Sequence, residues 1–526
     1  MKKYILMAVA GLALSSCGDF LEPDSTSEFV PKDVNSFNEL LLGEAYPRND
    51  VGGLNIFMNM LDDDITAAPY QTPQVGFNAD KYLGSYAWHP TMYEVMAQAN
   101  YFHSDMYQNY YKLILGCNAV LDYVDEDDVI GTAEMRNMVK AQAYTLRAFY
   151  YLTLVNIYGQ PYNVNPDALG VPLKLVSGIE EDENALKRKP VKDVYAQVVK
   201  DLTTAESLYL TLPEEKQWEK NFRTSLPMAQ LLLSRAYLYM ENWDKAAEYA
   251  KKVMDNRSFK LVDLNSVPAQ KENEEHIMVN AYTNYHAYTC SEAIWIYGSV
   301  SDMVGFTNDY PTANESGEKM HSFFQASKEL MDTFEENDLR ADRYIVHIDY
   351  GQVNDEGEKV LMPQAYGKVN VGENTYRPAG GPGIFGRSLR LSEAYLNYAE
   401  AKAMAGAANE AMNVLNQLRK FRFAPENYNQ QNFAGDELIK FVRDERRREL
   451  CYEGLRWNDL RRWGRKEFKH VWYIAKDTKV TYTLTDNDLL FTVPISGDAA
   501  GMNGQLVQNE LPKYEKRTGV TENIAK

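Results

Sequence analysis

The sequence predicts a mostly helical protein with a few short strands. Its main feature is a set of segments in which apolar residues recur every three or four positions, which is the spacing of one buried helix face. These segments span 105–124, 134–158, 191–210, 226–255 and 389–420. After residue 470 the pattern changes to short runs rich in β-branched and aromatic residues, at 480–484 and 490–494, which are typical of strands.

Two pairs of the helical segments resemble tetratricopeptide units, in which two antiparallel helices cross closely at a small residue. In the first pair, within 226–255, Ala236 supplies the small residue and a short turn precedes Trp243. The second pair, within 389–420, fits less well, and the earlier helices fit loosely. A tetratricopeptide array repeats about every 34 residues, whereas residues 260–388 separate these pairs. We therefore expect a helical wall inside a larger globular fold.

Composition limits the class of protein. The length of 526 residues alone would suggest several domains, but no Pro/Ser-rich linker or low-complexity run separates them. Its formal net charge of −19 is unfavourable for nucleic acid or an anionic lipid surface, so no nucleic-acid partner is expected. Beyond Cys17, the cysteines are too few and too scattered for a disulfide framework. We expect Cys117, Cys290 and Cys451 to be buried free thiols.

The N-terminus has the features of a bacterial lipoprotein signal. Two lysines are followed by an apolar run at 4–14, two serines and Cys17. The run is shorter than the roughly 20 residues that span a bilayer. We expect 1–16 to be a signal peptide and Cys17 to be acylated; the alternative is a plain signal peptide with an incidental cysteine. Turn-forming residues then dominate, which predicts an extended tether over 17–50.

No motif for a catalytic site, a cofactor or a metal is apparent, and none of the three is predicted. The seven histidines form no HExxH, there is no G-x-S-x-G, and the glycine-rich run 379–386 lacks the Lys-Ser/Thr of a phosphate loop. We interpret the acidic clusters 62–64 and 125–128 as solvated loop faces, with a loose calcium site as the alternative. A glycosidase needs two carboxylates around one bond, a pair that cannot be singled out among 74 acidic residues.

The segment 443–466 is rich in arginine but interleaved with acids, several of which lie three or four residues from an arginine. This spacing predicts ion pairs within a helix rather than phosphate contacts. Residues 444–463, DERRRELCYEGLRWNDLRRW, resemble the signature helix of the SusD/RagB family. The resemblance extends to the arginine-led stretch 389–401, to the closing strand and tail around 493–509, and to the lipidated start at 17–22.

The resemblance implies a mostly helical, single SusD-like domain in which four tetratricopeptide-like helix pairs support a loop-rich ligand face. Residues 51–260 would form its N-terminal part. Residues 261–526 would hold the loop-rich region, the fourth repeat and the signature helix, with Trp457 and Trp463 in the core. The resemblance also implies a non-catalytic, lipid-anchored protein at the cell surface of the outer membrane, which partners a SusC-like, TonB-dependent transporter.

Sugar chains bind to flat aromatic faces with polar neighbours, on loops held by a rigid scaffold. Trp88 matches a region in which the family often places a ligand-side tryptophan, and Trp295 lies in a strand-like run. Burial in the fold is the alternative for both. The residues predicted to bind the ligand are Trp88, Tyr86, Tyr82, His89, Tyr285, Tyr288, Trp295, Tyr297, Asp64 and Asn55.

Four functions are compatible with the sequence. We expect a protein that binds oligosaccharide or polysaccharide at the cell surface and delivers it to a SusC-like transporter. The alternatives, in descending order, are a RagB-like uptake lipoprotein that binds peptide or protein, a surface glycosidase, and an assembly protein without a ligand.

Overall fold

The fold was analysed in a computed structural model of the whole chain. The residues that it describes are 31–48, 54, 57–68, 80–99, 105–178, 183–269, 271–272, 278–279, 285–299, 323–353, 356–364, 368, 385–475 and 477–524.

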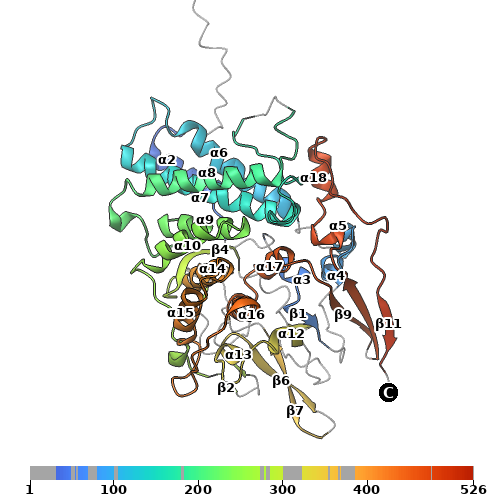
Figure 1. Cartoon of the computed structure of the whole chain (residues 1–526). Helices are drawn as coiled ribbons and strands as arrows, with labels where there is room; N and C mark the ends of the chain where they lie inside the picture. Colours follow the sequence, from blue (N-terminus) through green and yellow to red (C-terminus); the bar gives the residue numbers. More distant parts are fainter. Residues whose placement is uncertain are drawn as a thin grey trace, which may run out of the picture.

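Long helices occupy every segment in which the sequence predicts one. They are α6 (Met106–Tyr123), α7 (Ala133–Tyr158), α8 (Val191–Tyr209), α9 (Leu226–Tyr239), α10 (Trp243–Met254), α14 (Leu391–Met404) and α15 (Ala408–Arg419). Each of these helices packs on the next one along the chain, and α10 packs on α14 (Figure 1). The mostly helical prediction is confirmed, whereas the assignment of helix pairs to tetratricopeptide units stays an interpretation.

The remaining helices are shorter or lie around this wall. They are α2 (Val34–Glu44), α3 (Met58–Leu61), α4 (Asp80–Tyr86), α5 (Met92–Gln98), α12 (Lys328–Met331), α13 (Arg340–Arg343), α16 (Gly435–Leu450), α17 (Arg456–Arg462) and α18 (Gly497–Met502). The last part of the predicted tether is wrong, because α2 packs on α6 and α7. Val34, Phe37 and Leu41 form its buried face, at the spacing of a helix.

Two arginines from distant segments meet at the C-terminal end of α7. The helix has 26 residues and begins at Ala133, and the side chain of the preceding Thr132 caps its first turn. At the other end, Arg188 donates to the carbonyl of Tyr158 at 2.8 Å, and Arg461 donates to the carbonyl of Asn156. Both side chains are buried, and among the described residues neither has a carboxylate partner. Their charges offset the negative end of the helix dipole.

The strands are short and mostly antiparallel pairs. They are β1 (Ile65–Ala67) with β5 (Phe324–Ala326), β2 (Lys271–Glu272) with β3 (Met278–Val279), β4 (Ala293–Tyr297) with β8 (Arg387–Arg390), β6 (Val346–Val353) with β7 (Lys359–Gln364), and the sheet of β9 (Phe468–Ala475), β10 (Thr478–Leu484) and β11 (Val520–Asn523).

The strand predicted at 480–484 lies in β10, but the one predicted at 490–494 is wrong. The chain forms a 3-10 turn over Leu489–Phe491 instead. The carboxylate of Asp488 accepts the N–H of Leu490 at 2.9 Å, and such a local side-chain cap competes with a sheet.

One hydrophobic cluster connects most of the helices and strands, and a smaller one lies among α14, α15 and α16. All three described cysteines are buried free thiols, as predicted. Among the described residues, no helix combines the length and the apolar character that crossing a membrane would require.

Candidate functional site

The signature segment folds into α16, a tight turn and α17. Gly454 lies in the turn with φ of +75°, a backbone conformation that suits glycine. A Cβ atom built on Gly454 would lie 2.4 Å from a guanidinium nitrogen of Arg387. The turn thus brings the end of the signature segment against β8 and the helical wall.

The α16 side chain Glu449 is the centre of a buried ion network. Its carboxylate accepts two bonds from Arg422, both at 2.9 Å, and one each from Arg340 and Arg390, both at 3.2 Å. The side chains of all four residues are fully buried. Burial raises the pKa of Glu449, but the arginines around it together hold that pKa well below its ordinary value. The acid is therefore charged at neutral pH.

The same network continues through other carboxylates. Glu445 pairs with Arg340, Arg419 and Arg448 at 2.7, 2.9 and 2.6 Å. The prediction of salt bridging is confirmed, but the expectation that it lies within the helix is mostly wrong. The main pairs reach across the fold because α16 is buried, and only a few, such as Arg448 with Glu445, are local. The ionic segment is thus a structural core.

The acidic cluster 62–64 belongs to this core, so its interpretation as a solvated loop face is wrong. Asp62 and Asp64 are buried, and Asp63 binds Arg456 through two bonds of 2.6 and 2.8 Å. Asp64 accepts a 2.8 Å bond from Arg447. Because Asp64 is buried and paired, its position does not support the predicted contact with a ligand. The cluster 125–128, by contrast, is exposed.

The aromatic group around Trp88 is buried beneath β9. Trp88 has φ of +49°, donates its indole N–H to the carbonyl of Leu61 at 2.9 Å, and stacks on His470 at 4.2 Å. Tyr86 stacks on His470 at 4.1 Å. The exposed fraction of Trp88 is 0%. In the described fold, Trp88 therefore packs as the alternative interpretation states, and its face is not open to a sugar.

Tyr82 and His89 are buried as well. Tyr82 packs edge-on against Phe324 at 5.9 Å. His89 accepts the backbone N–H of Arg517 through Nδ1 at 2.8 Å, and burial lowers its pKa to about 4. Because Trp88, Tyr86, Tyr82 and His89 are all buried, we do not place the ligand on them. Asn55 lies outside the described residues.

The second predicted group lies on and before β4, and only one of its members reaches the surface. Tyr285, Trp295 and Tyr297 are buried, and the Trp295 indole donates to the carbonyl of Phe222 at 2.7 Å. Tyr288 is partly exposed. It is therefore the predicted ligand residue that a glycan could reach in the described fold.

Tyr288 is part of a group of three rings that we call the aromatic row: Tyr288, Phe385 and Phe222. The centroid of Phe385 lies 5.9 Å from that of Tyr288 and 6.2 Å from that of Phe222. Phe222 is partly exposed, as is Arg223 next to it, which donates to Asn38 at 2.6 Å. Rings with a polar neighbour are the combination that binds sugars. Sequence patterns gave no signal for Phe222 and Phe385, because they come from separate loops.

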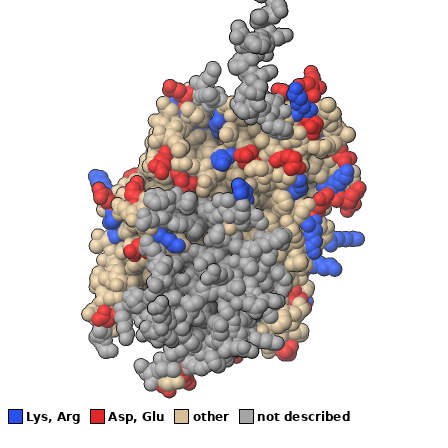
Figure 2. Space-filling view, turned by 180° about the vertical axis from the view of Figure 1, so that it is seen from behind, with Lys and Arg blue, Asp and Glu red and all other residues tan. Residues whose placement is uncertain are grey.

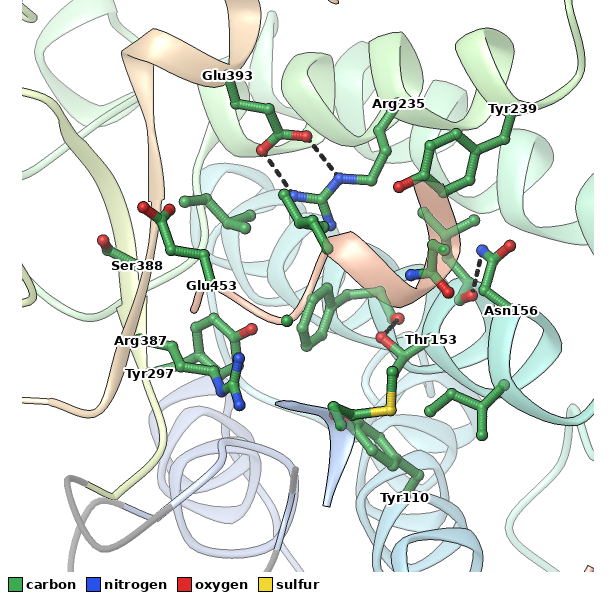
Figure 3. Close-up of a pocket in the computed structure, with 18 residues that line it drawn as sticks. Tyr110, Thr153, Asn156, Arg235, Tyr239, Tyr297, Arg387, Ser388, Glu393 and Glu453 are labelled. Atoms are coloured by element: carbon green, nitrogen blue, oxygen red, sulfur yellow. Dashed lines mark hydrogen bonds and ion pairs between the residues drawn. The ribbon is translucent and has the colours of Figure 1, made fainter. Parts of the chain in front are cut away.

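A polar cavity of about 50 Å³ lies deeper, between the helical wall and β8 (Figure 3). On one side Arg235 and Glu393 form a bidentate pair of 2.6 and 2.7 Å, and Arg387 and Tyr297 lie on another. This volume has room for a few water molecules. The cavity is thus too small for a sugar chain, and we place the candidate site at the aromatic row.

The charges on one face of the molecule are mixed in sign. On the face seen in Figure 2, the described acidic and basic side chains are interspersed, without a broad basic patch among them.

Within the described part of the chain, no group of three or more His, Cys, Asp or Glu side chains is placed to hold a metal ion.

Two family models match the chain. Residues 386–514 match the SusD family, and residues 53–238 match a family described as starch-binding associating with outer membrane. The chain belongs to the SusD-like family. The first match contains the signature segment with Glu445 and Glu449, whereas Arg340, one of their ion-pair partners, lies outside it.

Similar proteins agree with this placement. SusD-like protein P2 of Formosa agariphila is 26% identical over 62% of this chain and 65% of its own length, which is just under two thirds. SusD-like protein P25 of the same organism is 24% identical over 85% of this chain and 87% of its own length.

Solved structures share the fold of this SusD-like chain. A SusD-like carbohydrate binding protein from Bacteroides vulgatus superposes with a TM-score of 0.63 at 20% identity, covering 92% of this chain and all of that one. A SusD superfamily protein from the same species gives a TM-score of 0.66 at 19% identity, with the same coverage.

Proposed function

We propose that this SusD-like protein binds an oligosaccharide or polysaccharide at the outer membrane, without catalysis. The observation that carries the proposal is the match of residues 53–238 to a family described as starch-binding and outer-membrane-associated. The solved carbohydrate binding protein of the same fold supports the ligand class. Membership of a family of binding proteins supports the absence of catalysis.

The aromatic row is the proposed contact surface. Tyr288 and Phe222 are partly exposed, so a sugar ring can reach them from solvent. Tyr288, Phe385 and Phe222 lie within a few residues of β4, β8 and the start of α9, respectively, and β4 and β8 are paired by backbone hydrogen bonds. A fixed aromatic face stabilises a sugar without the entropic cost of ordering a loop.

The proposal extends to anchoring and delivery. Acylation of Cys17 would hold the protein on the outer membrane at the cell surface, and a SusC-like, TonB-dependent transporter would receive the glycan. The lipoprotein-like N-terminus supports the first step, and family membership supports the second.

Calorimetry of soluble protein, residues 18–526, against soluble starch, other plant glycans, host and microbial glycans and a peptide pool tests this function. We expect heat from one glycan class and no release of sugar products over hours. Binding of peptides alone would move the function to RagB-like peptide uptake, and release of shortened sugars would indicate a glycosidase.

A further inference from the structure

Lys368 lies between β7 and β8 and inserts its ammonium group into the ion network. The side chain is 1% exposed. Its three donors have three acceptors: the carbonyls of Glu449 and Cys451 at 2.6 and 2.9 Å, and the carboxylate of Glu453 at 2.8 Å. These carbonyls lie at the C-terminal end of α16, where the helix dipole favours a cation. The ammonium is thus fully satisfied.

Lys368 and the rest of the network share partners. Glu453 also binds Arg390, the last residue of β8, through bonds of 2.5 and 3.2 Å. Burial raises the pKa of Glu453, but Arg390 and Lys368 outweigh it and hold that pKa at about 2. The Lys368 ammonium also lies 4.4 Å from the ring centroid of Tyr344, a cation–π distance. Lys368 therefore fixes a carboxylate and a ring together.

The network in turn holds the segment that carries Tyr288. The ring of Tyr285 packs edge-on against Tyr344 at 5.1 Å, and the guanidinium of Arg390 lies 5.5 Å from its centroid. The hydroxyl of Ser388 lies 3.1 Å from the Tyr285 carbonyl, to which it donates. Tyr285 is therefore fixed from the network on one side and from β8 on the other.

Two further hydrogen bonds connect Tyr285 and Ser388 to the aromatic row. His286 Nδ1 lies 2.9 Å from the Ser388 hydroxyl, and the N–H of Phe385 donates to the His286 carbonyl at 3.0 Å. The Phe385 ring then contacts Tyr288. A chain of buried contacts thus runs from Lys368 through Glu453, Arg390 and Tyr285 to the row.

We propose that Lys368 is a positioning residue that couples the signature segment to the aromatic row, so that loss of its ammonium group loosens residues 285–290 and weakens ligand binding. Without it, two carbonyls lose a donor and Glu453 keeps only Arg390. Buried polar groups that lose a hydrogen-bond partner cost stability. Residues 285–290 then become more mobile, because Arg390 and Tyr344, which contact Tyr285, lose part of the network that holds them. The binding part of the proposal rests on the proposed function, whereas the ordering part does not.

Hydrogen exchange of Lys368→Met, measured by mass spectrometry on peptides from 285–290 and from α7, tests the ordering. We expect exchange at 285–290 to rise at least tenfold and exchange in α7 to stay within twofold of wild type. Arg147→Met is the matched control, because it breaks a buried pair with Asp201 between α7 and α8 at 2.8 Å. Its exchange should rise in α7 instead. Unchanged exchange at 285–290 in Lys368→Met would overturn the proposal.

A second variant and an affinity measurement complete the test. Ser388→Ala removes one hydroxyl from the same chain of contacts and leaves the ions in place, so it should raise exchange at 285–290 even if Lys368→Met fails to fold; no rise would overturn the coupling. Affinity for soluble starch, or for the glycan that the wild type binds, should fall at least tenfold in Lys368→Met and stay constant in Arg147→Met. Raised exchange with unchanged affinity would overturn the positioning role. A wild type that binds no glycan would contradict the proposed function, and the exchange result would still decide the ordering.

Discussion

Replacing Glu449 by glutamine should destabilise the protein strongly, because the substitution preserves shape and removes one charge from the centre of the ion network. Glu449 accepts bonds from three buried arginines and from the hydroxyl of Tyr344 at 3.0 Å. Breaking a buried ionic cluster from one side costs about 3–5 kcal/mol, since the remaining charges lose their partner. We expect Glu449→Gln to lower the free energy of unfolding by that amount.

Urea unfolding followed by circular dichroism and tryptophan fluorescence measures this loss. Glu134→Gln is the control, because Glu134 pairs with Lys216 at the surface, where both side chains are more than 40% exposed; it should cost below about 1 kcal/mol. The effect has a pH signature. The folded-state pKa of Glu449 is depressed, so its stabilisation is present above the ordinary glutamate pKa of about 4.3 and declines as pH falls below it. A loss under 1 kcal/mol at pH 7 would refute the assignment of this network to the core.

Two other substitutions test separate parts of the fold. Asp62 is buried without an ion pair among the described residues, and burial, Asp64 and Asp63 raise its pKa well above the ordinary value. Its ionisation therefore costs stability as pH rises through the folded-state pKa, so Asp62→Asn should stabilise by on the order of 1 kcal/mol at pH 8 and by less at pH 4; a pH-independent melting difference would contradict this. Gly454→Ala should cost more than about 1 kcal/mol, because it adds a clash with Arg387 to the strain of positive φ. Gly406→Ala, with φ of +80° and open space around it, is the control for strain alone; equal losses would rule out the clash.

The helices could be predicted from the sequence because their apolar spacing is a local property. The same rule could have found α2, since Val34, Phe37 and Leu41 follow it, but the turn formers around this short stretch favoured a tether. The family resemblance could be found because the signature residues 444–463 are contiguous in the sequence. Trp457 is buried as predicted, whereas Trp463 is only partly buried and donates to Glu400 at 3.0 Å.

The exposure of single aromatic side chains could not be predicted, because it depends on residues that are distant in the chain. Trp88 is covered by His470 on β9, and the charges of Asp63 and Asp64 are offset by arginines of the signature segment. No local pattern contains these contacts. The same reason explains why Phe222 and Phe385 were missed although they lie beside the predicted Tyr288.

The most direct test of the proposed function is a calorimetric comparison of Tyr288→Ala with Tyr123→Ala on the glycan that the wild type binds. Tyr123 is 46% exposed at the end of α6, outside the aromatic row, and serves as the matched control. Loss of a stacked ring should weaken binding by about 1–2 kcal/mol, which is roughly five- to thirtyfold in Kd, while both variants keep the wild-type melting temperature. Equal affinities for the two variants would contradict the placement of the glycan site at the aromatic row.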